Sequence, residues 1–220
     1  MGKKKEKYVI DTNLYVQHSN SVSACDSNSV SACVRNCLFS STYFDKVSES
    51  QFERDLANNI PISWDVNSYN VTNADVKKIY DDIRLPERAT IGSAGYDFFA
   101  PFDFTLYKGQ TIVIPTGIRW ISKDPIFFLS LYPRSGFGFK FGLSLANTVG
   151  IIDSDYHESA NEGHIMVKLS NDGIHNKDIS FKTGDAFCQG IILPFLTTTN
   201  DDCNSKEKRN GGFGSTDKKD

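Results

Sequence analysis

Short apolar runs separated by Gly, Pro, Asn and Asp fill the chain from Pro86 to about Thr197. Runs of this kind, enriched in β-branched and aromatic residues and bounded by turn formers, are typical of β-strands. The strands predicted from them lie at residues 96–99, 111–114, 117–121, 126–132, 143–145, 164–169, 179–181 and 190–193. Because no helical periodicity separates these segments, they predict an all-β sandwich or barrel.

Residues 43–83 show a different pattern, with helical rather than alternating periodicity. Ser48 followed by Gln51 resembles a capping box, which predicts a helix over residues 49–58. Asn73 is suited to begin a second short helix, because its side chain can accept a hydrogen bond from a first-turn N–H group. The apolar side chains expected on the buried faces of these two helices are Phe52, Leu56, Val76, Ile79 and Tyr80. We therefore expect a short helical region before the β domain.

The two ends of the chain differ from its centre in composition. Residues 19–25 recur without change as residues 27–33, within a Ser- and Asn-rich stretch that has few side chains to bury. Two short copies cannot form a stacked repeat structure, so we expect residues 1–42 to form a flexible extension. The β domain is expected over residues 84–200, and the charged, Gly-rich residues 201–220 are expected to form a flexible arm.

Composition and charge limit the classes of function. The chain has 220 residues, a formal net charge of −3 and no apolar run long enough for a membrane span. The weakly acidic balance argues against a duplex nucleic-acid binder, because such proteins need clustered positive charge. Five cysteines without an export signal favour free thiols in a reducing compartment. We expect a cytoplasmic protein, or a nuclear one in a eukaryotic or viral host, that binds neither membrane nor nucleic acid.

The segment that follows the predicted strand at 126–132 has the donors that an anion requires. Arg134 and Ser135 offer a guanidinium fork and a hydroxyl, and the turn at Gly136 exposes backbone N–H groups, which together suit a phosphate chain. A purely structural turn at the end of a strand is the alternative. Gln189 interrupts another apolar strand, so its amide needs a partner from a ligand or from the backbone.

Acidic residues stand out at two other places. Asp153 and Asp155 lie just beyond an apolar run, and on an extended chain two such side chains point to the same side. An Asp held there can orient and deprotonate a water molecule. The alternative is a turn in which both side chains hydrogen-bond to their own backbone. Asp97 lies inside an apolar strand and must therefore be exposed, paired or close to a metal ion.

These segments occur in the order of the motifs of the trimeric dUTP diphosphatase (dUTPase) family, which this chain resembles over residues 84–217. The segments that resemble the five motifs are Ala94–Asp97, Pro133–Gly136, Gly150–Tyr156, Gly184–Gln189 and Gly211–Thr216. Residues 44–48 and the insert after Tyr156 are similar to the branch found in bacteriophages and Gram-positive bacteria. The resemblance does not extend to the duplicated N-terminal segment.

The resemblance implies a jelly-roll fold that assembles as a homotrimer, with three active sites that are each built from all three subunits. It also implies Mg²⁺-dependent hydrolysis of dUTP to dUMP and pyrophosphate, which limits uracil incorporation into DNA and supplies dUMP. In this pattern Asp153 activates the water that attacks the α-phosphorus, and Asp97 holds Mg²⁺ through the water shell of the ion.

The same resemblance implies how the nucleotide is bound. A hairpin after Asn147 is expected to bind uracil through its backbone and the Asn147 side chain, while Tyr156 packs against the deoxyribose and excludes a 2′-hydroxyl. Phe213 is expected to stack on uracil in a closed C-terminal arm, and either Lys208 or Arg209 to meet the γ-phosphate. The full set of residues expected to bind substrate is Arg134, Ser135, Gly136, Asn147, Gly150, Ile152, Tyr156, Gln189, Arg209, Phe213, Gly214, Ser215 and Thr216.

Two other functions fit part of the pattern. A dCTP deaminase shares a similar fold but needs a Glu general base beside the pyrimidine, and Asp153 together with the complete fifth motif favours phosphohydrolysis. A regulatory binding module is the second alternative, in which the loop at residues 157–163 or the N-terminal extension captures another protein.

Overall fold

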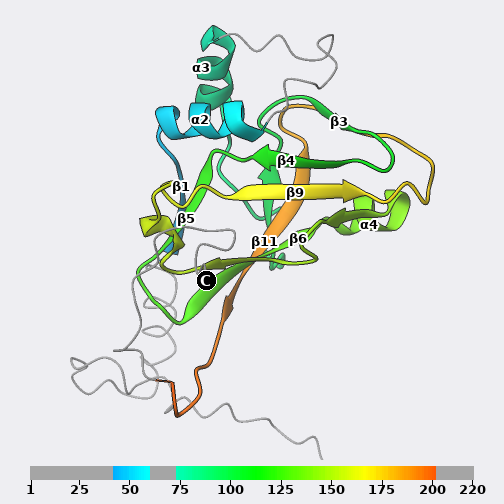
Figure 1. The fold of residues 1–220 in the computed structure, drawn as a ribbon. Helices are drawn as coiled ribbons and strands as arrows, with labels where there is room; N and C mark the ends of the chain where they lie inside the picture. Colours follow the sequence, from blue (N-terminus) through cyan, green and yellow to red (C-terminus); the bar gives the residue numbers. More distant parts are fainter. Residues whose placement is uncertain (1–41, 60–72, 202–220) are drawn as a thin grey trace, which may run out of the picture. The chain divides into compact units, whose positions relative to one another are not determined.

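The computed structural model describes residues 42–59 and 73–201, which form mainly β-structure (Figure 1). The strands are β1 Thr42–Lys46, β2 Tyr96–Phe99, β3 Phe104–Leu106, β4 Thr111–Pro115, β5 Ile118–Ser122, β6 Phe127–Pro133, β7 Leu143–Leu145, β8 Gly150–Asp153, β9 Met166–Asn171, β10 Ile179–Phe181 and β11 Ala186–Pro194. The helices are α2 Glu49–Asn59, α3 Asn73–Asp82 and α4 Ser135–Phe141, with a 3-10 turn at Tyr156–Glu158.

The all-β prediction is confirmed, and the strands form a jelly-roll arrangement. One sheet has the order β2-β11-β6-β8 and another the order β4-β9-β7, while β1 pairs with β5 and β10 with β3. The pairings are antiparallel, and β11 lies between strands that precede it by many residues. Such pairings between distant segments are typical of Greek-key and jelly-roll sandwiches. All of the predicted strand segments overlap strands of the structure.

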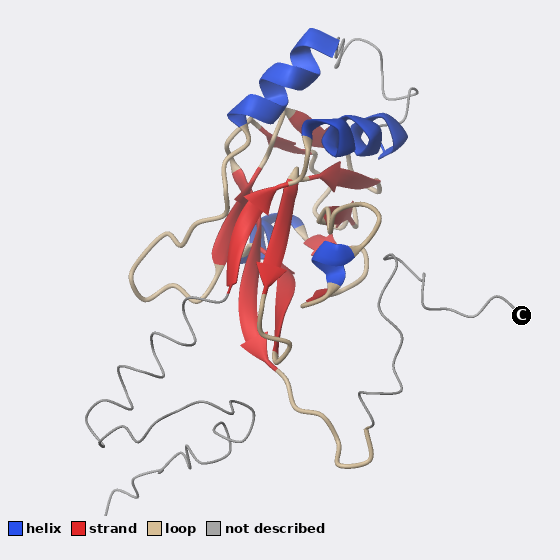
Figure 2. Cartoon of the chain, turned by 90° about the vertical axis from the view of Figure 1, so that its left-hand side faces the viewer, coloured by secondary structure: helices blue, strands red, loops and turns tan. Residues whose placement is uncertain are grey.

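Both predicted helices are present, and they contact each other beside the β-structure (Figure 2). The N–H group of Gln51 donates to Ser48 Oγ at 3.2 Å, which is the first half of the predicted capping box. The second half is supplied from elsewhere, because the Ser48 N–H group donates to Glu162 Oε2 at 2.7 Å. Phe52 and Leu56 are buried as expected. The start of α2 is thus fixed by a carboxylate from a distant loop.

Some elements were not predicted from the sequence: β1, β3, β8 and α4. Strand β1 pairs with β5, so residues that precede the helices belong to the β-structure. Helix α4 has the sequence SGFGFKF, in which glycines and aromatic residues are poor helix formers. Its place is set by packing, since the Phe137 ring lies 4.7 Å from the ring of Phe181 in β10, measured between centroids. Tertiary contact therefore overrides local propensity here.

The core is rich in aromatic side chains and joins the sheets to the helices. Trp120 and Phe52 are among its largest buried side chains. Between β4 and β5, Gly117 has a positive φ of 72° and is packed against Ile83, with which any added Cβ would clash. None of the helices in the described ranges combines the length and the apolar character needed to cross a membrane.

Candidate functional site

A cleft of about 550 Å³ lies beside β2, β11 and the start of α4. It brings together residues from three segments that the sequence singled out separately. Its lining consists of Ala89, Ser93, Ala94, Gly95, Asp97, Arg134, Ser135, Gly136, Phe137, Gln189 and Ile191. The predicted phosphate-binding residues and the predicted metal-binding carboxylate therefore share one concave surface.

An ion pair between Asp97 and Arg134 is the main electrostatic feature of the cleft. Arg134 Nε lies 3.1 Å from Asp97 Oδ1, and the Asp97 side chain is 15% exposed. Arg134 Nη1 also donates to the carbonyl oxygen of Ala186 at 3.3 Å, which fixes the direction of the guanidinium group. The Asp97 carboxylate is therefore paired with a positive charge, and this pairing offsets the free-energy cost of placing a lone charge inside the strand.

Gln189 is held close to this ion pair. It lies opposite Asp97 in the pairing of β11 with β2, and its Nε2 donates to the carbonyl oxygen of Pro133 at 3.3 Å. A Cβ at Gly95 would lie only 2.5 Å from Gln189 Oε1, so the absent side chain at Gly95 lets the amide oxygen approach. Gln189 thus has a backbone partner in the described chain and presents its amide to the cleft.

The Arg-Ser-Gly segment differs from its predicted form. The sequence predicts a turn after the strand, whereas Ser135 and Gly136 form the first turn of α4, with Arg134 at its N-cap. Phe137 and Gly138 already donate to the Arg134 carbonyl, at 3.1 Å each, so the helix begins directly after the strand. The N–H groups of the first two helical residues, Ser135 and Gly136, precede these hydrogen bonds and are the ones that suit an anion. Both Ser135 and Gly136 are exposed.

The segment predicted as a hairpin after Asn147 also differs in form. Strand β7 pairs with β9 and strand β8 pairs with β6, so the two strands lie in different sheets and the prediction of a paired hairpin is wrong. A tight turn joins them, in which Thr148 has a positive φ of 67° and its N–H group donates to Leu145 O at 2.9 Å. Asn147 is exposed on this turn, whereas Gly150 is buried and Ile152 is partly buried against the core.

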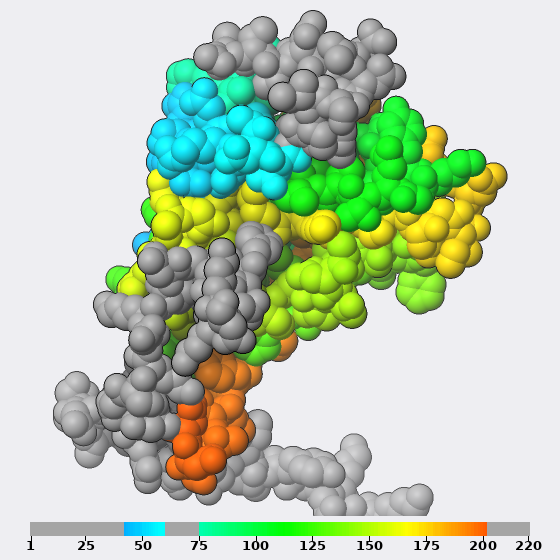
Figure 3. All heavy atoms as spheres, in the orientation of Figure 1, coloured from blue at the N-terminus to red at the C-terminus, as the bar shows by residue number. Residues whose placement is uncertain are grey.

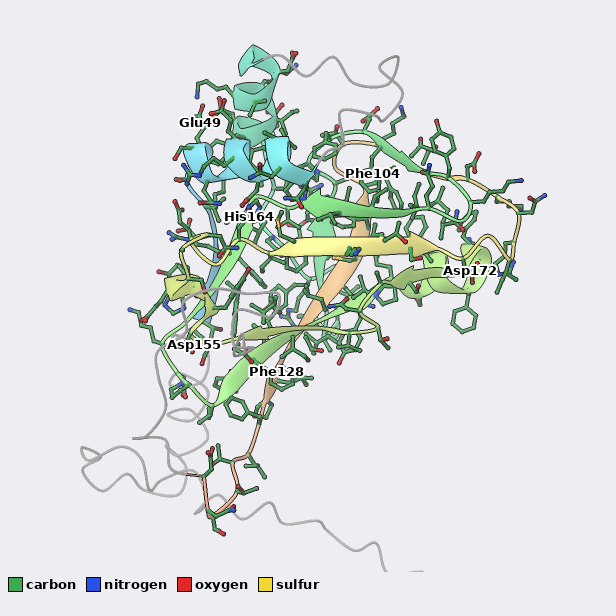
Figure 4. All side chains as sticks on the ribbon, in the orientation of Figure 1. Glu49, Phe104, Phe128, Asp155, His164 and Asp172 are labelled. Carbon is green, nitrogen blue, oxygen red and sulfur yellow. The ribbon has the colours of Figure 1, made fainter. Side chains whose placement is uncertain are left out.

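The two carboxylates beyond this turn do not share one face of an extended chain. Strand β8 ends at Asp153, and Asp155 has φ −88° and ψ −2° at the start of the 3-10 turn. The prediction of a same-side pair is therefore wrong, because side-chain alternation ends with the strand. Asp153 is half-buried at the strand end, and Asp155 is exposed (Figure 4).

Within one chain, Asp153 and the cleft lie at opposite ends of β6. Asp153 pairs with Phe128, whereas Gln189 pairs with Tyr132 and donates to the carbonyl oxygen of Pro133, the last residue of the strand, after which Arg134 and Ser135 line the cleft. At about 3.3 Å per residue, the five-residue separation corresponds to roughly 16 Å. A general base must approach its target within hydrogen-bond reach or through one water molecule. Asp153 is therefore too far from Arg134 and Ser135 of the same chain for these residues to contact one phosphate group together with it.

Tyr156 is more enclosed than the sequence indicated. Its side chain is 4% exposed, and its hydroxyl group donates to the carbonyl oxygen of His164 at 3.2 Å. The hydroxyl oxygen also accepts a hydrogen bond from Asn161 Nδ2 at 2.8 Å. A sugar ring can contact only the small part of the ring that stays exposed.

Sequence reasoning missed the buried pair formed by His164 and Asp55. His164, labelled in Figure 4, is fully buried, and its Nδ1 lies 2.6 Å from Oδ2 of Asp55, a residue of α2. Its Nε2 accepts a hydrogen bond from the Gly117 N–H group at 2.7 Å, so the proton belongs on Nδ1 and the ring is neutral. Nothing in the local sequence could reveal this pair, because its members are far apart in the chain and lack the spacing of a motif.

The carboxylate of Asp55 is stabilised in its charged form by this arrangement. Burial raises its pKa, but hydrogen bonds from His164 and Gln51 act in the opposite direction and leave the pKa below its ordinary value. Gln51 Nε2 donates to Asp55 Oδ2 at 2.7 Å. These side chains join α2 to the loop that follows Tyr156.

The cleft fits the Mg²⁺ that the sequence implies. Asp97 contributes a carboxylate to an open space of about 550 Å³, and Mg²⁺ usually binds through one or two carboxylates, its own water molecules and substrate phosphates. Within the described ranges, no three His, Cys, Asp or Glu side chains are grouped closely enough to enclose a metal ion. The residues therefore fit an ion held through water and substrate rather than by a protein cage.

The predicted residues of the C-terminal arm lie outside the described residues. They are Lys208, Arg209, Phe213, Gly214, Ser215 and Thr216.

Comparison with known proteins identifies relatives across most of the described chain. The model of the dUTPase family matches residues 81–217, which is more than half of the chain. A deoxyuridine 5′-triphosphate nucleotidohydrolase of Lactococcus lactis is 37% identical over 136 residues, which cover 61% of this chain and 88% of that protein. A protein of the same name from Aeromonas salmonicida is 39% identical over 144 residues, covering 63% of this chain and 90% of that protein.

A solved structure also resembles the fold. The crystal structure of dUTPase from Streptococcus mutans aligns with a TM-score of 0.48 and 32% identity, and the match covers 55% of this chain and 91% of that chain.

Proposed function

Because this chain belongs to the dUTPase family, we propose that it is a dUTP diphosphatase, which hydrolyses dUTP to dUMP and pyrophosphate. The observation that carries the proposal is the meeting of Asp97, Arg134 and Gln189, from three separate motifs, on one cleft. A guanidinium group, an amide and a carboxylate there suit a phosphate chain and its metal ion. The reaction removes dUTP before it can enter DNA and supplies dUMP.

Asp153 is proposed as the general base. It would take a proton from the water that attacks the α-phosphorus, and it stands at the end of β8, where the backbone is fixed by pairing with β6. The phosphate chain would be bound by Arg134, Ser135 and Gly136 at the start of α4, with Gln189 close to the α-phosphate.

Uracil would be recognised at the turn that joins β7 to β8. Fixed backbone donors and acceptors there, with the exposed Asn147 side chain, can match uracil and leave polar groups unpaired against cytosine. Backbone groups of Gly150 and Ile152 belong to the same segment. Tyr156 would pack against the deoxyribose. Residues of the arm, Arg209 or Lys208 with Phe213, Gly214, Ser215 and Thr216, would close over uracil and the γ-phosphate.

Asp97 would hold Mg²⁺ through its water shell, and the bound ion would gather the triphosphate oxygens and offset their charge. Its pairing with Arg134 keeps the carboxylate in place before substrate binds.

We also propose that the active form is a homotrimer whose sites are shared between subunits. The separation of roughly 16 Å along β6 between the Asp153 end and the Pro133 end supports this proposal, because one chain cannot bring both groups to one phosphorus. A second copy must therefore complete each site. Residues 1–42 and 201–220 are proposed as an N-terminal extension and a C-terminal arm of the jelly-roll domain, in a protein of the cytoplasm.

The finer placement in the branch of phages and Gram-positive bacteria is likewise a proposal. It is supported by the segment at residues 44–48 and by the insert after Tyr156. Relatives in Lactococcus lactis and in Aeromonas salmonicida are similarly identical to this chain, so overall identity does not decide the branch.

Pyrophosphate release from dUTP, dTTP, UTP and dCTP tests the activity. We expect hydrolysis of dUTP with strong preference over the other three nucleotides, and Asp153→Asn should lower the rate at least about 100-fold while nucleotide binding remains. Asp82→Asn, at the exposed end of α3, is the matched control and should leave the rate unchanged. Near-normal turnover by Asp153→Asn would remove Asp153 from the proposed role. Ammonia release from dCTP would instead identify a deaminase.

A further inference from the structure

The insert that follows Tyr156 folds back onto the hydroxyl group of that residue. Asn161 Nδ2 donates to the hydroxyl oxygen at 2.8 Å, and the hydroxyl group donates to the carbonyl oxygen of His164 at 3.2 Å. The phenol is thus both acceptor and donor within one loop. Because the ring is also buried, it cannot shift without breaking these two hydrogen bonds.

The Asn161 amide is fixed at both ends. Its oxygen accepts a hydrogen bond from the Gly163 N–H group at 3.2 Å, so the amide nitrogen must face Tyr156. Gly163 has a positive φ of 73°, and a Cβ there would lie 2.5 Å from His157 Cα. Gly163 is therefore needed for the backbone path of the loop, because a side chain there would clash with the backbone of His157.

Helix α2 supports the loop from the outside. Glu162 accepts hydrogen bonds from Ser48 N at 2.7 Å and from Ser48 Oγ at 2.6 Å, and the buried side chain of His164 contacts Asp55. In the space-filling view the cyan atoms of α2 lie directly on the yellow segment that includes this loop (Figure 3). These contacts fix the loop against helix α2 through both Glu162 and His164.

We infer that Asn161 and the backbone of His164 are positioning residues that hold the Tyr156 ring and thereby set selectivity for a deoxyribose over a ribose. The inference rests on the proposed function, in which Tyr156 packs against the sugar. A ribonucleotide carries an additional 2′-hydroxyl, and the ring must move away to make room for it. A ring held at its hydroxyl end resists that movement, so the selectivity depends on the hydrogen bonds of the loop as well as on the ring itself.

Steady-state kinetics with dUTP and UTP test this inference in the full-length chain. The variants are Tyr156→Phe, which removes the hydroxyl group but keeps the ring, and Asn161→Ala, which removes the donor. Each should lower the ratio of kcat/KM for dUTP to that for UTP about 5- to 10-fold, with the larger effect in Tyr156→Phe, which removes the hydrogen bonds to both Asn161 and His164. The change should appear mainly as a lower KM for UTP.

Two further variants separate positioning from simple destabilisation. Asn161→Asp keeps the acceptor for the Gly163 N–H group but cannot donate to the Tyr156 hydroxyl oxygen, so it should lower the ratio as Asn161→Ala does if the donor is what matters. Ala160→Ser alters an exposed neighbour in the same loop and should keep the wild-type ratio. The double variant Tyr156→Phe with Asn161→Ala should resemble Tyr156→Phe alone, because that substitution already removes the contact with Asn161.

The outcomes distinguish this inference from the proposed function. If the wild-type protein does not prefer dUTP to UTP, the proposed function itself is wrong. If the wild-type protein has this preference but Asn161→Ala and Tyr156→Phe keep the ratio within twofold, the inference is overturned. Equal losses of dUTP and UTP turnover, without a change of ratio, also overturn it, because they indicate a purely structural role.

Discussion

Replacement of His164 by leucine removes the polar contacts that join α2, the loop after Tyr156 and the turn at Gly117, with little change of side-chain volume. The substitution leaves the buried N–H group of Gly117 without its acceptor, which costs about 1–3 kcal/mol. Asp55 loses a hydrogen bond to a charged group, which is ordinarily worth about 1.5–3 kcal/mol. This second cost is reduced because Asp55 keeps Gln51 as a donor and its side chain is 17% exposed.

The combined expectation for His164→Leu is a decrease of about 3–5 kcal/mol in the free energy of unfolding. Urea denaturation at a fixed protein concentration measures this quantity, and the concentration must be fixed because assembly contributes to apparent stability. His175→Leu is the matched control, since His175 is exposed on a loop, and it should change stability by less than about 0.5 kcal/mol.

A third variant divides the effect between the two contacts. His164→Gln can place an amide oxygen near the position of Nε2, so it should recover part of the cost due to Gly117 but not the contact of a ring N–H with Asp55. If His164→Leu unfolds within about 1 kcal/mol of the wild-type protein, the buried pair does not stabilise the fold and the reasoning is refuted.

Three further predictions concern Glu162, Cys188 and the C-terminal arm. Burial raises the pKa of Glu162, but its hydrogen bonds with Ser48 outweigh this effect and hold the pKa below the ordinary value of 4.5. Because the folded-state pKa is lowered, the charged carboxylate stabilises the fold above pH 4.5, and this stabilisation is lost as the pH falls through the lowered pKa. Glu162→Gln should therefore decrease the free energy of unfolding by about 1–2 kcal/mol above pH 4.5 and have no effect at lower pH. Denaturation at several pH values measures this, and a decrease independent of pH would contradict it. Burial raises the pKa of the Cys188 thiol far above its ordinary value, so peptide mapping after alkylation at pH 8 should find Cys188 modified only in denaturant, and fast labelling of the folded chain would count against its burial. Truncation after Lys208 should strongly lower dUTP turnover but leave the assembly intact in size-exclusion chromatography, and a monomeric product would show that the arm is needed for assembly.

The candidate site residues could be predicted from the sequence, because their identification depends only on residue types within short segments. Asp97, Arg134 and Gln189 each stand out where a polar side chain interrupts or ends an apolar strand. Their meeting on one cleft could not be derived from those segments alone. It depends on the pairing of β11 with both β2 and β6, which is a long-range property of the sheet.

Predictions from the sequence failed where the backbone conformation differs from the secondary structure that its local residues favour. Asp153 and Asp155 were expected on one extended face, but the strand ends between them. Helix α4 forms from glycines and phenylalanines because Phe137 packs on Phe181, a residue far away in the chain. Neither result follows from propensity, since both depend on what the segment contacts.

By itself, the sequence determined eight of the eleven strands in the described residues, helices α2 and α3 and the chemical character of each motif, because alternation, capping and turn formation act over a few neighbouring residues. Only the tertiary structure decided that Asp153 lies at the far end of β6 from the cleft, and that His164 is buried against Asp55. Strand register and burial are set by the packing of the whole core, in which residues far apart in the chain exclude water from one another.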